Sequence, residues 1–227
     1  MKRVMADVKL ARKKGVSSIF KIILYISDLF PERSYPSALS SLTTYIKEPH
    51  LPSLIHTFLH QQFDISDDGS PTSKFEYMPD MLEMISPISV FHSAIATFYA
   101  PSDISGICGM RRKRIRSTPV WRATGPRKDC VFVVENQEKP GFRGMSVVRV
   151  KIFFSFIYEG EEYPCALVEW FKKIGTSPEE QTGMWVVKPE NDNYGRRLTS
   201  VVHINTIQVS LLSPRLTHVT RGNIISG

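Results

Sequence analysis

Paired cysteines are missing from this sequence. Its three cysteines, Cys108, Cys130 and Cys165, lie far apart, and no two of them form a Cys-x-x-Cys pair. An odd number of widely spaced cysteines argues against a disulfide scaffold and favours a reducing compartment. Structural zinc sites usually draw on closely spaced ligand pairs, so we expect no zinc ribbon or finger. Buried thiols are the favoured interpretation, and a loose zinc cluster with His92 and His203 is the alternative.

Long apolar runs are absent as well. The most apolar stretch near the N-terminus, residues 16 to 30, is interrupted by Lys21 and Asp28. A membrane-spanning helix needs about 20 apolar residues. Basic residues precede the stretch, as in a signal peptide, but no small-x-small cleavage site follows it. We therefore expect no membrane association.

Signatures of common enzyme chemistry are also lacking. The sequence has neither a Gly-x-Ser-x-Gly nucleophile elbow nor a Gly-x-x-x-x-Gly-Lys-Ser/Thr phosphate loop. An acidic metal site for phosphoryl transfer is an alternative, but no pair stands out by spacing among Asp103, Asp129, Glu135, Glu169 and Asp192. We predict a protein that is not an enzyme, with no cofactor, metal or small-molecule substrate.

Positive charge is what the sequence has in excess. Its 29 Lys and Arg against 22 Asp and Glu give a formal charge of +7, with a pI near 9.3. A basic balance favours polyanionic partners such as nucleic acid or anionic lipid. The 42% hydrophobic content and 227-residue length suit one folded core with a smaller attached unit.

Apolar periodicity predicts helices in the first third of the chain. Apolar residues recur at three- and four-residue intervals from Ile19 to Phe30, from Leu39 to Ile46 and from Leu51 to Phe63. Pro31 ends the first predicted helix, since a proline inside a helix removes a backbone donor. Ser37 is placed to cap the second helix.

Strand patterns replace helical ones from about residue 86. Short runs rich in β-branched and aromatic residues alternate with turn signals, at residues 88–100, 129–136, 147–175, 183–189 and 200–207. Several short strands with turns between them suggest a small barrel, because closure removes exposed edges. The predicted fold class is α+β: an N-terminal helical unit followed by a small antiparallel, partly open β-barrel-like domain.

The polar, Gly- and Pro-containing stretch from 64 to 74 is the best boundary in the chain. The predicted division is a helical unit at 1–64, a linker at 65–85, a β-barrel-like domain at 86–213 and a tail at 214–227.

Residues 147 to 175 read as one hairpin. In its first arm Val148, Val150, Ile152, Phe154 and Phe156 alternate with the residues between them, which predicts one continuous apolar face with Arg149 and Lys151 on the other. The aromatic residues of this region are predicted to be core; the alternative is an aromatic cage for methylated lysine. They are Phe153, Phe154, Phe156, Tyr158, Tyr163, Trp170, Phe171 and Trp185.

The strongest local feature is a basic segment at residues 111–128, which contains no carboxylate. Its candidate nucleic-acid-binding residues are Arg111, Arg112, Lys113, Arg114, Arg116, Trp121, Arg122, Arg127 and Lys128. Such cations neutralise phosphates and release counterions, and the Trp ring can stack on an exposed base. Two other interpretations stay open: a solvated connector between strands whose Trp packs on the barrel, or a nuclear import signal at 111–114.

Several long motifs in one order carry a family resemblance: residues 88–122, 125–133, 149–175, 182–187 and 200–207. As a set they resemble the C-terminal segment of fungal transposase-like proteins of the Plavaka type, in the Kyakuja-Dileera-Zisupton group of DNA transposons. Residues 38–63 look like the linker before that segment. The family's catalytic core and Cys-rich finger have no counterpart in this sequence, and Asn205 stands where the family usually has aspartate.

The resemblance implies a non-catalytic accessory module related to a transposase C-terminus. Together with the basic segment it predicts weak binding to DNA or to a chromatin-associated protein, and a nuclear location with the cytoplasm as alternative. A protein–protein interaction module, or a decayed transposon fragment, with no nucleic-acid role is the alternative function.

Overall fold

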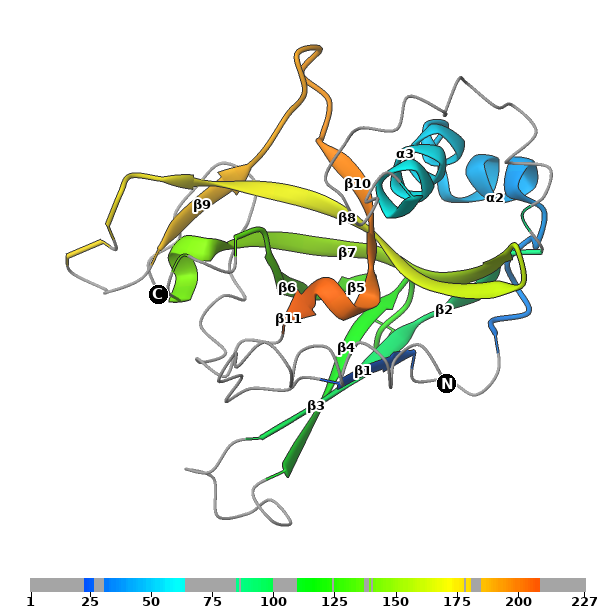
Figure 1. Cartoon of the computed structure of the whole chain (residues 1–227), viewed down its shortest axis with the longest axis horizontal. Helices are drawn as coiled ribbons and strands as arrows, with labels where there is room; N and C mark the ends of the chain where they lie inside the picture. The colour runs from blue at the N-terminus through cyan, green and yellow to red at the C-terminus, as the bar shows by residue number, and fades with distance from the viewer. Residues whose placement is uncertain are drawn as a thin grey trace.

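The computed structural model describes residues 23–26, 31–63, 85, 87–99, 110–123, 125–136, 139, 141–177, 179–180 and 185–208. In this part of the chain, two sheets and two helices form three layers: helices, a seven-stranded sheet and a four-stranded sheet (Figure 1). The α+β class is therefore confirmed. Neither described helix is long and apolar enough to cross a membrane.

The helices are α2 (Leu39–Ile46) and α3 (Leu51–Phe63). α3 has the predicted extent, but the predicted cap of α2 is wrong. Ala38 occupies the cap position without a side-chain hydrogen bond, while the Ser37 carbonyl accepts from the Ile88 amide at 2.8 Å. Ser37 therefore joins the helix entry to the sheet.

The seven-stranded sheet is built on the long β7–β8 hairpin, with neighbours in the order β10-β8-β7-β6-β11; in addition β2 pairs with β7 and β9 with β8. Its strands are β2 (Ser89–Phe91), β6 (Cys130–Val134), β7 (Met145–Tyr158), β8 (Glu161–Ile174), β9 (Val186–Pro189), β10 (Thr199–His203) and β11 (Ile207–Gln208). A short 3-10 turn precedes β7 (Gly141–Gly144) and another joins β10 to β11 (Ile204–Thr206).

The four-stranded sheet has the order β1-β3-β4-β5, with β1 (Ile23–Ile26), β3 (Ser93–Tyr99), β4 (Met110–Thr118) and β5 (Arg127–Lys128). β3 and β4 run out from beneath the larger sheet in Figure 1. β1 corrects the prediction of a first helix over this stretch, because Ile23 to Ile26 pair antiparallel with β3. Isoleucine is β-branched and suits a strand, and the pairing overrides the helical spacing.

The described strands do not close into a barrel, which corrects the barrel-like prediction. Each face of the seven-stranded sheet is instead covered by a separate layer. The helix-side core includes Leu42, Leu51, Ile55, Leu59, Ile152, Phe154, Phe156 and Leu167. The inter-sheet core includes Ala94, Ala96, Ile115, Val148, Val150, Phe153, Ala166 and Val168. Covering both faces buries the apolar side chains without any need for closure.

A β-bulge in β7 corrects the predicted continuous apolar face. Val150 lies opposite Val168 and Ile152 opposite Leu167, so Lys151 is an extra residue in the ladder. After an extra residue, the alternation of the strand is shifted by one, so the side chains beyond it face the opposite layer from the one expected. Val150 accordingly packs in the inter-sheet core, whereas Ile152 packs in the helix-side core.

Candidate nucleic-acid interface

The basic segment begins as a paired strand and not as a loop. β4 pairs antiparallel with β3 along its length, from Arg116 opposite Ser93 to Met110 opposite Tyr99. A turn then leads to β5, whose Lys128 and Arg127 lie opposite Ser117 and Thr118. Residues 111 to 118 are therefore a paired strand and not a connecting loop, although Arg112, Lys113 and Arg114 are exposed to solvent.

Strand alternation divides the predicted residues between two faces. Side chains directly opposite each other in an antiparallel pair share a face, and alternate residues along a strand share it too. One face therefore carries an arginine row, which we call the arginine face: Arg112, Arg114, Arg116 and Arg127. Lys113 and Lys128 lie on the opposite face of the hairpin. Ser117 is on that face too and contacts β7, where its hydroxyl donates to the Lys151 carbonyl.

Trp121 gathers three guanidinium groups at one end of the arginine face. The guanidinium carbons of Arg116, Arg127 and Arg122 lie 4.5, 4.8 and 5.3 Å from its ring centroid. The ring is half-buried, and the Trp121 amide donates to the Gly125 carbonyl at 2.7 Å. Cation–π attraction thus stabilises a crowded set of like charges.

Asp129, which follows the basic segment directly, organises this end of the face. Its carboxylate accepts from Arg127 Nε and from the Arg116 backbone amide, both at 2.9 Å. Burial, and then the charge of Arg127, lowers the pKa of Arg116, although an arginine remains charged at neutral pH. Among the described residues, Asp129 is thus one carboxylate in contact with two of the clustered arginines, which leaves this end of the face positive.

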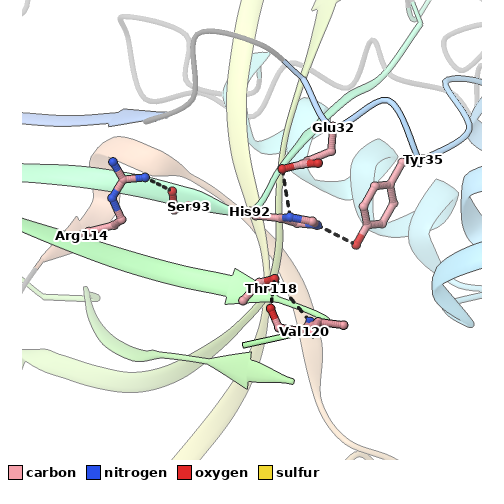
Figure 2. Close-up of polar contacts among 7 residues, drawn as sticks. All are labelled: Glu32, Tyr35, His92, Ser93, Arg114, Thr118 and Val120. Atoms are coloured by element: carbon pink, nitrogen blue, oxygen red, sulfur yellow. Dashed lines mark hydrogen bonds and ion pairs between the residues drawn. The ribbon is translucent and has the colours of Figure 1, made fainter. Parts of the chain in front are cut away.

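The other end of the arginine face is exposed. Arg112 and Arg114 are solvent-exposed on β4, and Arg114 Nη1 donates to Ser93 Oγ at 2.9 Å (Figure 2). This bond holds the Arg114 side chain along the sheet. Arg111 lies in β4, but its side chain is outside the described residues.

The structure also contains side-chain contacts between residues that lie far apart in the sequence. His92 lies between Glu32 and Tyr35, with Nδ1 3.0 Å from Glu32 Oε1 and Nε2 3.2 Å from the Tyr35 hydroxyl (Figure 2). Near it, Lys151 pairs with Glu48 at 2.7 Å and with Glu169 at 3.6 Å. Both groups join residues far apart in the chain, so no local pattern reveals them.

The remaining candidate groups fall elsewhere. Most of the aromatic residues are core as predicted, with Phe153, Phe154, Phe156, Tyr158 and Phe171 all buried. Cys165 is buried and Cys130 half-buried, while Cys108 and Asp103 lie outside the described residues. Among the described side chains, no three of the His, Cys, Asp or Glu type gather closely enough to hold a metal.

Replacing the ring that holds the guanidiniums tests how much the cluster contributes to stability. Trp121→Leu keeps apolar bulk but removes three cation–π contacts, each contributing about 0.5–1 kcal/mol at an exposed site. We expect the free energy of unfolding to fall by about 1–2 kcal/mol in urea titrations followed by circular dichroism. Trp185→Leu is the control, because the cation over the Trp185 ring, Lys173 Nζ, lies 5.9 Å from its centroid, farther than any guanidinium of the Trp121 cluster. Equal losses in the two variants would contradict a role for the guanidiniums.

The chain matches no protein-family model, no curated protein and no solved structure.

Proposed function

We propose that this protein binds nucleic acid, DNA above all, weakly and without sequence preference through the arginine face. The observation that carries the proposal is the row of Arg112, Arg114, Arg116 and Arg127 on one face, with Asp129 as the carboxylate among them. Cations that contact phosphates release counterions and so supply affinity that does not depend on sequence. The role is that of a non-catalytic accessory module in the nucleus, in line with the resemblance to a transposase C-terminus.

The spacing of the row supports contact with a nucleic-acid backbone. Alternate residues of a strand recur on one face about every 7 Å. This separation is similar to that of successive phosphates along a nucleic-acid strand, so Arg112, Arg114 and Arg116 can follow consecutive phosphates. A guanidinium also matches a phosphate with two parallel hydrogen bonds.

Neutralising the exposed end of the row tests the proposal. Fluorescence anisotropy with labelled duplex and single-stranded DNA gives the binding constant as a function of salt. We expect Arg112→Gln with Arg114→Gln to reduce the slope of log K against log salt by about 2, for all sequences alike.

The matched control removes two exposed lysines from the other sheet. Lys172→Gln with Lys188→Gln changes the net charge equally, at a cross-strand pair of β8 and β9. We expect this variant to keep the wild-type slope. The proposal fails if the wild-type chain shows no affinity at low salt, or if the two double variants lose affinity equally.

A further inference from the structure

A cavity of about 190 Å³ lies at the β7 bulge, bordered by α2, the β4–β5 hairpin and the seven-stranded sheet. Its lining includes Tyr35, Tyr45, Lys128, Lys151, Ile152 and Leu167. Ser117, Thr118 and Pro119, which like Lys128 belong to the basic segment, line it as well. The four arginines of the arginine face are not among the lining residues, so the cavity is separate from the proposed nucleic-acid contact.

A break in the ladder beside β7 creates this space. On the side away from β8, β6 pairs with β7 as far as Arg149 and β2 pairs with it from Phe153. Between these points, the Ser117 hydroxyl lies 2.6 Å from the Lys151 carbonyl oxygen, and the Val150 amide donates to the Asp129 carbonyl at 3.1 Å. Bulges of this kind often border binding sites, because they redirect side chains.

The two lysines of the cavity differ in how their charges are balanced. Lys151 has two carboxylate partners, Glu48 and Glu169. In the part of the chain that the structure describes, no ion pair involves Lys128, although its side chain is solvent-exposed. Partial burial, and then the charge of Lys151, lowers the pKa of Lys128, while the Glu169 carboxylate acts in the opposite direction. Three cations, Lys128, Lys151 and Arg149, thus face two carboxylates, Glu48 and Glu169, and the excess positive charge is accessible at the exposed Lys128.

The rest of the lining is neutral and mostly apolar. The Tyr35 and Tyr45 rings meet edge to face with centroids 5.1 Å apart. Burial raises the pKa of Tyr35, so its hydroxyl stays protonated. The Glu32 carboxylate favours the Nδ1–H form of His92, which leaves Nε2 to accept from that hydroxyl. His92 thereby orients the Tyr35 ring, while Ile152 and Leu167 add aliphatic surface.

We propose that this cavity binds a small organic monocarboxylate, with its carboxylate on Lys128 and its hydrocarbon body against Ile152, Leu167 and the tyrosine rings. A single negative charge balances the excess of Lys128, Lys151 and Arg149 over the Glu48 and Glu169 carboxylates, whereas a second would be repelled by those carboxylates. The volume corresponds to roughly six water molecules, which suits an acid of the size of benzoate. The sequence predicted no small-molecule substrate, because the bulge that opens the cavity has no sequence signal.

Benzoate is the probe for the test. Titration into the full chain, followed by amide chemical shifts in nuclear magnetic resonance, is expected to give a dissociation constant on the order of millimolar. Lys128→Met removes the cation and is expected to weaken binding about tenfold or more. Loss of this charge relieves repulsion with Lys151, so the variant is expected to fold. Lys113→Met is the matched control, since it removes an exposed lysine of the same hairpin face away from the cavity.

Two further measurements distinguish the contribution of the carboxylate charge to binding from that of the hydrocarbon body. Benzamide, the neutral counterpart of benzoate, is expected to bind the wild-type chain about tenfold more weakly. Tyr45→Ser is expected to weaken benzoate binding, because it removes a ring from the wall. The proposal is overturned if benzoate causes no shifts, if it binds Lys128→Met as it binds the wild type, or if benzamide binds as tightly as benzoate.

Discussion

Lys151→Met is expected to lower the free energy of unfolding by about 3–5 kcal/mol. The Lys151 ammonium lies 2.7 Å from Glu48 Oε2, and the Glu48 side chain is only 10% exposed. Removing the lysine leaves a nearly buried carboxylate without its partner, and an uncompensated buried charge is far more costly than a missing pair. Urea unfolding at neutral pH measures the loss.

The reverse change is expected to have a smaller effect. Glu48→Gln leaves Lys151 with Glu169 at 3.6 Å, so we expect a loss of about 1–3 kcal/mol. Adding Glu48→Leu to Lys151→Met removes both charges and is expected to recover much of the lost stability. Lys172→Met, at an exposed position of β8, is the control and should change the free energy of unfolding by about 0.5 kcal/mol or less. A double variant as unstable as Lys151→Met alone would contradict the argument.

Phe154→Ala is expected to destabilise the helices and the sheet together, by about 3–5 kcal/mol. Phe154 is 1% exposed in the helix-side core, which also contains Leu51 and Ile55 of α3. Truncation removes apolar contacts and leaves a cavity that the surrounding side chains fill only in part. Because both layers share this core, far-ultraviolet circular dichroism and tryptophan fluorescence should report one coincident transition.

The same experiment tests the predicted division between a helical unit at 1–64 and a separate β domain. Ile157→Ala is the control, since Ile157 lies on the same strand but is 48% exposed; its expected loss is below about 1 kcal/mol. If the helical signal of Phe154→Ala melted at its own midpoint, the helices would be an independent unit, as the sequence predicted.

The β7–β8 hairpin and α3 could be predicted because local chemistry specifies them. The turn residues Glu159 and Gly160 both have positive φ, 51° and 77°, and glycine adopts that conformation without strain. α3 follows the apolar spacing from Leu51 to Phe63, with Pro52 in its first turn, where a missing backbone donor has no effect. In each case the signal lies within a few residues of the element that it predicts.

The candidate site was predicted in composition but not in arrangement. The sequence brings the cations together in one segment, yet strand pairing decides that Arg112, Arg114, Arg116 and Arg127 share a face and that Lys128 turns away. In the sequence, Asp129 is only one of several scattered carboxylates. Its contacts with Arg116 and Arg127 arise from the hairpin.

By itself the sequence determined the α+β class, the long hairpin, the third predicted helix and the concentration of positive charge. Each of these depends on periodicity, turn residues or composition, which act over short distances along the chain. The tertiary structure alone decided that Ile23–Ile26 is a strand, that Lys151 forms a bulge and that two layers cover the sheet. These outcomes depend on pairing and packing between distant segments. The free energy of these long-range contacts exceeds local conformational preferences, and short sequence patterns do not reveal it.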